Sequence, residues 1–171
     1  MKDILKPIAV LGAICLIVTA LLAFINSVTS PIITAAEQRA AQEARLEVMP
    51  EATSFEPLEA ELPEGVTEAY LADNGGYVLL LSTKGYGGEI ILACGILDGK
   101  IVKIKTLSHS ETSGIGTKVV ASDYGDSYCG TSEEDYESVD TVTGATISSK
   151  AYRKALAAAF EAVDRLEKEA M

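Results

Sequence analysis

The sequence predicts an α+β protein in which an N-terminal transmembrane helix precedes a small antiparallel sheet packed against helices. An uncharged apolar run, two strand pairs with hairpin turns and a C-terminal segment of helical periodicity support this prediction. The chain has 171 residues, and 25 acidic residues against 14 basic ones give a net charge of -11. Because phosphate neutralisation needs grouped cations and no basic cluster occurs, this charge argues against nucleic-acid binding.

The apolar run covers residues 8–25 and reads IAVLGAICLIVTALLAFI. At about 1.5 Å per residue, a helix of this length roughly spans a hydrocarbon core. Lys2 and Lys6 precede the run, and the next basic residue is Arg39. The positive-inside rule therefore predicts a cytoplasmic N-terminus and an extracytoplasmic chain from about Asn26 onward. A cleaved signal peptide is the alternative, but the length of the run and the lack of an A-x-A-like site favour a retained anchor.

The chain beyond the anchor divides by composition. The segment between Pro31 and Pro50 is rich in Ala, Glu, Gln and Arg, which favour a helix. Acidic residues and prolines in the stretch that follows are typical of a linker. The predicted division is 1–30 for the cytoplasmic N-terminus and transmembrane helix, 31–65 for a juxtamembrane helix and linker, and 66–171 for the folded domain.

Two β-hairpins are predicted in the folded domain, each with its own turn signal. The Asn74-Gly75 and Asp98-Gly99 dipeptides lie between apolar runs, as in tight hairpin turns. The paired segments are 69–72 with 77–81, and 90–96 with 101–107.

Two polar, glycine-rich segments follow predicted strands. Gly85, Gly87 and Gly88 lie in KGYGGEI, which is either a plain loop or a place where the backbone approaches another group closely. Residues 107–119 read LSHSETSGIGTKV and contain the single histidine of the chain, His109. A polar segment at a strand end is a common place for a site. A lone histidine with one Glu111 is nevertheless more often a satisfied loop pair than a catalytic dyad.

The cysteines predict no metal centre. Cys15 lies in the apolar run, and Cys94 and Cys129 are far apart without a CxxC or Cys/His spacing. An extracytoplasmic location is compatible with a Cys94–Cys129 disulfide. The alternative is that Cys94, inside a strand pattern, is a small core hydrophobe.

The C-terminal helix begins at an unusual sequence, TVTGAT. A hydroxyl of Thr143, Thr146 or Ser148 could cap the first turn, but capping needs only one such residue. Several hydroxyls beside Gly144 and Ala145, at the positive end of a helix dipole, would also suit a phosphate. Neither a Walker P-loop nor a dinucleotide-binding glycine pattern is present. The residues alone leave capping and anion binding open.

DTVTGAT, residues 140–146, resembles the flavinylation motif of the FMN-binding domain family, Asp-x-x-(Ser/Thr)-Gly-Ala-(Thr/Ser). In that family FMN is attached through a phosphoester to the final hydroxyl residue, which here is Thr146. GYGG at 85–88 and HSETSGIG at 109–116 are similar to two further segments of the family. Ser113 and Ile115 stand where the family has Pro and Leu, and the chain has no tryptophan, so the shape of the flavin pocket could differ.

The resemblance implies covalently bound FMN, whose own chemistry performs the electron transfer, without a catalytic residue or a metal. It implies that Asp140 and Thr143 serve the modification, and that glycines and the Glu111-Thr112 pair approach the flavin. The cofactor-binding residues expected from the resemblance are Thr146, Thr143, Gly144, Ala145, Asp140, Glu111, Thr112, Gly87 and Gly88.

The order of the motifs after a single membrane helix is most similar to the G-subunit family of the Rnf complex, an ion-translocating ferredoxin:NAD⁺ oxidoreductase. This resemblance implies an electron-transfer subunit of the cell membrane with no substrate turnover of its own. Its implied partners are the other Rnf subunits and an FAD-dependent flavin transferase for maturation. Alternatives are the C subunit of the Na⁺-translocating NADH:quinone reductase, which is typically longer, and a stand-alone flavinylated carrier. In another class, a membrane-anchored binding module would use TVTGAT only as a helix cap.

Overall fold

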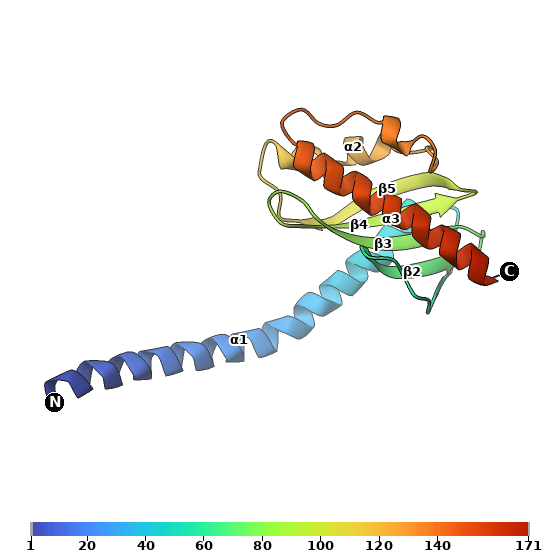
Figure 1. Cartoon of the computed structure of the whole chain (residues 1–171). Coiled ribbons are helices and arrows are strands. Elements are labelled where there is room, and N and C mark those ends of the chain that lie inside the picture. Colours follow the sequence, from blue (N-terminus) through green and yellow to red (C-terminus); the bar gives the residue numbers. More distant parts are fainter. Residues whose placement is uncertain (1, 171) are drawn as a thin grey trace. The chain divides into compact units, whose positions relative to one another are not determined.

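A computed structural model describes residues 2–170, and the side chains of Lys2 and Lys6 lie outside the described part (Figure 1). The chain forms two compact units, residues 1–40 and 41–171. The elements in chain order are α1 (Lys2–Val48), β1 (Phe55–Pro57), β2 (Val66–Ala72), β3 (Tyr77–Lys84), β4 (Glu89–Leu97), β5 (Lys100–His109), η1 (Gly116–Lys118), α2 (Ser122–Asp126), η2 (Tyr136–Ser138) and α3 (Thr146–Ala170).

The five strands form one antiparallel sheet in the order β1-β2-β3-β4-β5. Both predicted hairpins are confirmed, with Tyr70 opposite Val78 and Cys94 opposite Ile104. At the β4–β5 turn Asp98 has φ 52° and Gly99 has φ 71°, as a two-residue type I′ turn requires. Together with the helices, this sheet confirms the predicted α+β class.

Strand β1 lies within the stretch that composition predicts as a linker. It pairs antiparallel with β2, with Phe55 opposite Ala72 and Pro57 opposite Tyr70. A proline fits here because β1 is an edge strand, where a missing N–H interrupts no ladder. The strand has three residues and no alternating pattern of its own, so periodicity gives no signal for it.

Both faces of the sheet are covered, as alternate residues of β3 show. Leu79 and Leu81 belong to the core beneath α3, whereas Val78 and Leu80 belong to a second cluster on the opposite face. Figure 1 shows α3 lying across one face of the sheet. A strand buried on both faces reads as a continuous apolar run, which explains the sequence YVLLL at this place.

The C-terminal end of α1 packs on the face opposite α3. Val48 is fully buried there, and its carbonyl lies so close to Gly95 of β4 that a Cβ at this position would collide with it. Glu47 forms salt bridges with Lys103 and Lys105 of β5. The hydrogen bond from Lys105 lowers the pKa of the Glu47 carboxyl below its usual value. Partial desolvation of this carboxyl acts in the opposite direction but is the weaker effect.

Among the described residues, one helix is long and apolar enough to cross a membrane, and it lies within Val10–Val48 of α1. Its large apolar side chains, such as Leu16 and Phe24, are exposed to more than half of their surface. A helix that exposes apolar residues on all sides needs a membrane or a partner to cover them. Length and composition therefore support association with a membrane.

Leu156→Ala should lower the free energy of unfolding by about 2–5 kcal/mol, because it removes a fully buried side chain between α3 and the sheet. Denaturant unfolding of the full chain in detergent measures this loss. Leu46→Ala, at a position 52% exposed, is the control and should change stability by less than about 0.5 kcal/mol. Equal effects of the two substitutions would contradict the assignment of the core.

Candidate functional site

Three segments that are far apart in the sequence meet where α3 begins. They are the β3–β4 loop, the segment that follows β5, and the turn before α3 together with the first residues of the helix. Between them lies a pocket of about 400 Å³. Its lining residues are Tyr86, Glu111, Thr112, Ile115, Gly116, Gly144, Ala145, Thr146, Ile147 and Ser148.

A tight turn delivers the chain into α3. The Ala145 N–H donates to the Val142 carbonyl at 2.9 Å, and Gly144 has φ 85°. A residue with positive φ at the third position is typical of a type II turn, and glycine adopts it without steric cost. The nearest atom to a Cβ built on Gly144 is Ile115 Cγ2 at 3.8 Å, so the backbone conformation and not the space selects glycine here.

No hydroxyl of TVTGAT caps the helix in the described structure. The first helical hydrogen bond runs from the Ser149 N–H to the Ala145 carbonyl at 2.9 Å, and alanine has no side-chain acceptor. Within residues 2–170, the N–H groups of Thr146, Ile147 and Ser148 have no side-chain acceptor. An uncapped helix start with free N–H groups is favourable for an anion. The geometry thus favours anion binding over simple capping.

Glu111 lies at the floor of the pocket and joins all three segments. Its side chain is buried, with 8% of its surface exposed. One carboxylate oxygen accepts from the Ser148 hydroxyl at 2.8 Å, and the other accepts from the Gly87 N–H at 3.4 Å. Because hydrogen bonds to a charged acceptor are stronger than neutral ones, this carboxylate is the main polar link between the segments.

The glycines of the β3–β4 loop permit a close approach of two backbones. A Cβ on Gly87 would collide with the Ser110 carbonyl and lie 2.9 Å from the Glu111 Cα. A Cβ on Gly85 would collide with the Glu111 carboxylate itself. KGYGGEI is therefore a place where the backbone approaches another group closely and not a plain loop, because any larger residue at Gly85 or Gly87 would displace Glu111 from the pocket floor.

His109 is part of a local loop contact and does not line the pocket. Its side chain is exposed, and its Nδ1 accepts a hydrogen bond from the Glu111 N–H at 3.3 Å. The imidazole thus holds the backbone that carries Glu111. This is the satisfied pair with Glu111 that the sequence favours over a catalytic dyad.

Three of the pocket's lining residues, Tyr86, Ile115 and Ile147, have large and mostly exposed side chains. Tyr86 is 71% exposed, Ile115 is 51% exposed and Ile147 is 56% exposed. Each comes from a different one of the three segments. Exposed apolar groups around a partly polar pocket are typical of a site for an aromatic ligand. The sequence shows Tyr86 within the GYGG segment and Ile147 within the periodic helix, but nothing in its periodicity predicts that either lines a site.

The structure separates the expected cofactor-binding residues into two groups. Glu111, Thr112, Gly144, Ala145 and Thr146 line the pocket. The other four do not line it: the side chains of Asp140 and Thr143 are exposed, and the glycines support the loop behind Glu111. The residues missed from the sequence are Tyr86, Gly116, Ile147 and Ser148, which line the pocket beside the motif positions.

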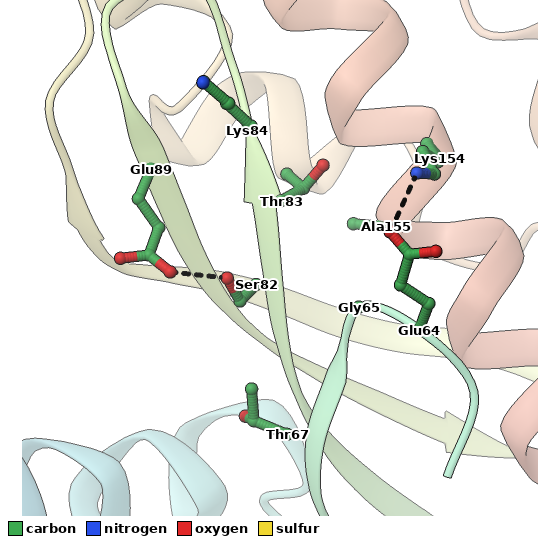
Figure 2. Close-up of a pocket in the computed structure, with 9 residues that line it drawn as sticks. All are labelled: Glu64, Gly65, Thr67, Ser82, Thr83, Lys84, Glu89, Lys154 and Ala155. Atoms are coloured by element: carbon green, nitrogen blue, oxygen red, sulfur yellow. Dashed lines mark hydrogen bonds and ion pairs between the residues drawn. The ribbon is translucent and has the colours of Figure 1, made fainter.

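A larger cavity, of about 520 Å³, lies between β3 and the middle of α3 (Figure 2). It contains none of the motif residues. Three of its four charged side chains have partners, since Lys154 pairs with Glu64 at 3.7 Å and Glu89 accepts from the Ser82 hydroxyl at 2.7 Å. Its size therefore does not make it the better candidate.

The cysteines of the folded domain are free thiols. Cys94 is fully buried in the core beneath α3, and burial raises the pKa of its thiol to about 12. A thiol with so high a pKa is a poor nucleophile at neutral pH. Within the part of the chain that the structure describes, no group of three or more His, Cys, Asp or Glu side chains could hold a metal ion.

Two known families match parts of the chain. Residues 85–161 match the family model of the FMN-binding domain, and residues 1–48 match that of the RnfG N-terminal region. The chain thus contains an FMN-binding domain, preceded by an N-terminal region of the RnfG type.

Curated relatives cover nearly the same length. The G subunit of the Na⁺-translocating ferredoxin:NAD⁺ oxidoreductase complex of Acetobacterium woodii is 28% identical over 95% of each chain. The G subunit of the ion-translocating oxidoreductase complex of Stutzerimonas stutzeri is 30% identical over 88% of this chain and 77% of its own. The corresponding subunit of the proton-translocating complex of Clostridium ljungdahlii is 27% identical over 87% and 85%. The chain belongs to the G-subunit family of ion-translocating oxidoreductase complexes.

Ser148→Ala should destabilise the domain by about 1–3 kcal/mol, because a buried carboxylate oxygen of Glu111 loses its donor. A double-mutant cycle with Glu111→Ala, which removes both acceptor oxygens, should give a coupling energy of about 0.5–3 kcal/mol. Denaturant unfolding of the four full-length variants in detergent measures it. Additive effects would show that the two side chains do not interact and would contradict the arrangement of the pocket floor.

Proposed function

We propose that the protein is the electron-transfer subunit of a membrane-bound, ion-translocating ferredoxin:NAD⁺ oxidoreductase of the Rnf type. In this proposal FMN is attached by a phosphoester to Thr146. The observation that supports it most directly is the position of Thr146: an exposed hydroxyl on the first residue of α3, in the lining of the pocket and beside free helical N–H groups. The complex as a whole would perform the turnover and the ion transport.

The residues present fit both ends of FMN. The uncapped start of α3 offers N–H groups and a positive dipole to the phosphate. The side chains of Tyr86, Ile115 and Ile147 offer apolar surface to a flat ring. The bound cofactor would supply the one- and two-electron chemistry, and this chain would hold it, orient it and limit its contact with water. No side chain is needed as a catalytic base for the electron transfer.

Attachment would require that a transferase reach Thr146. In this step the Thr146 Oγ forms a bond to the FMN phosphorus of FAD, the phosphoanhydride of FAD breaks, AMP leaves, and the hydroxyl proton is lost to the transferase or to water. Asp140, Thr143 and Gly144 are exposed in the described structure and so present an accessible surface next to the acceptor. Their role would be recognition by the transferase, whereas Glu111 and Thr112 would face the bound flavin.

Thr146→Ala should abolish covalent flavin, because the acceptor oxygen is removed while the exposed position tolerates alanine. Intact mass after co-expression with a flavin transferase should show one esterified FMN on the unmodified chain and none on the variant. Thr141→Ala is the matched control, since it removes an exposed threonine of the same segment that has no expected role in attachment, and it leaves the acceptor. Thr146→Ser should retain flavin. Flavin on Thr146→Ala, or none on the unmodified chain with an active transferase, would contradict the proposal.

We also propose the arrangement in the membrane: residues 1–30 form the cytoplasmic N-terminus and the span, 31–65 the juxtamembrane helix and its connection, and 66–171 the extracytoplasmic FMN-binding domain. Lys2 and Lys6 lie directly before the span, whereas the first basic residue beyond it is Arg39. This difference in positive charge between the two ends of the span supports the orientation. The names of the relatives support the other subunits of an Rnf complex as partners. An FAD-dependent flavin transferase would be the maturation partner.

Cys129 provides a test of the orientation because it is exposed, whereas Cys94 is buried. A membrane-impermeant maleimide should label Cys129 of the full chain in right-side-out vesicles and not in sealed inverted vesicles. Partial desolvation by neighbouring residues raises the pKa of the Cys129 thiol, so mildly alkaline pH favours the reactive thiolate. Cys129→Ser is the control for labelling elsewhere. The reverse pattern would place the domain in the cytoplasm.

A further inference from the structure

Two side chains of α3 that belong to no motif reach back to the segment before the helix. Ser149 is fully buried, and its Oγ accepts a hydrogen bond from the Val142 N–H at 3.1 Å. The Arg153 guanidinium donates to the Val139 carbonyl. The two residues are four apart and therefore lie on the same face of the helix, and their partners belong to the segment that leads to Thr143 and Gly144.

Ala145 belongs to the main core cluster, and Val139 and Val142 pack against it, but the segment has few other hydrogen bonds. Its own backbone bonds are the turn bond from Ala145 to Val142, at 2.9 Å, and a long bond from the Val139 N–H to the Tyr136 carbonyl, at 3.5 Å. Within the described residues, the backbone groups of Asp140, Thr141 and Thr143 form no hydrogen bond with other backbone groups. Asp140, Thr141, Thr143 and Gly144 are all exposed. Ser149 and Arg153 thus provide the side-chain hydrogen bonds that fix the backbone of the segment to the helix.

From this arrangement we propose that Ser149 and Arg153 are positioning residues for flavin attachment. By fixing residues 139–145 against α3, they present the Thr146 hydroxyl and the free N–H groups in one geometry before the transferase arrives. A reacting group held in place in advance does not have to be ordered during the reaction. The inference rests on the proposed attachment to Thr146 and extends it to residues outside the attachment motif.

Ser149 should act through its acceptor oxygen. Ser149→Ala leaves the Val142 N–H without its partner and loosens the turn, while Ser149→Thr keeps a hydroxyl at the same position. For Arg153, glutamine shortens the side chain and removes its charge, so it loses the contact with Val139. The matched controls are Ser127→Ala, which removes a serine bond to the Tyr124 carbonyl, and Arg165→Gln, which removes another arginine of α3.

The experiment measures two quantities on the full chain in detergent. The first is hydrogen exchange of the 139–145 segment before flavinylation. The second is the initial rate of flavin attachment by purified transferase with FAD, at several concentrations of the chain, so that kcat and KM are separated. Melting temperatures of all variants identify any that fail to fold.

Ser149→Ala and Arg153→Gln should speed exchange in the segment and lower kcat/KM for attachment by roughly tenfold to a hundredfold, the range expected for a misplaced reacting group. Ser149→Thr should restore both quantities, and the controls should change neither. Faster exchange with an unchanged rate of attachment would overturn the positioning role, as would equal losses in the controls. If the unmodified chain accepts no flavin, the proposed function itself fails. If the unmodified chain and Ser149→Ala accept flavin at the same rate, only the positioning role fails.

Discussion

The buried carboxylate of Glu111 is the contact on which the site depends. It accepts from Ser148 of α3 and from Gly87 of the β3–β4 loop, while its own backbone continues from β5. A carboxylate enclosed in this way must be hydrogen-bonded, because an unsatisfied buried charge is strongly destabilising. The requirement fixes the helix, the hairpin loop and the segment after β5 at one point, and the pocket is the space that these three segments leave open.

The start of α3 complements this fixed floor. Most helices satisfy their first N–H groups with a capping side chain, but here the residue that accepts the first helical bond is Ala145. The threonines that surround it remain exposed, and the positive end of the dipole opens toward the pocket. The hydroxyl-rich TVTGAT is therefore better explained by binding of an anion and by an acceptor hydroxyl than by stabilisation of the helix. The missing cap lowers the stability of the helix start, and the hydrogen bond from the Val142 N–H to Ser149 offsets part of this loss.

Much of the fold was predictable because its signals are local. The Asp98-Gly99 turn, the apolar strands and the periodic helix after Thr146 each follow from short stretches of sequence. Strand β1 was not predictable, because three residues ending in proline acquire their role from pairing with β2. In the site, the motif residues were found by resemblance to a family. Ser148, Ser149 and Arg153 were not, because their partners lie 37, 7 and 14 residues away and only the fold brings them together.

The most direct test of this account is to locate the flavin on the chain. Trypsin should release residues 119–150 as one peptide, since Lys118 and Lys150 are consecutive cleavage sites. This peptide contains Thr143, Thr146, Ser148 and Ser149, and its fragmentation in a mass spectrometer assigns the modified hydroxyl. The account predicts FMN on Thr146 alone, the first residue of α3. FMN on Thr143 or on either serine would contradict the geometry of the helix start.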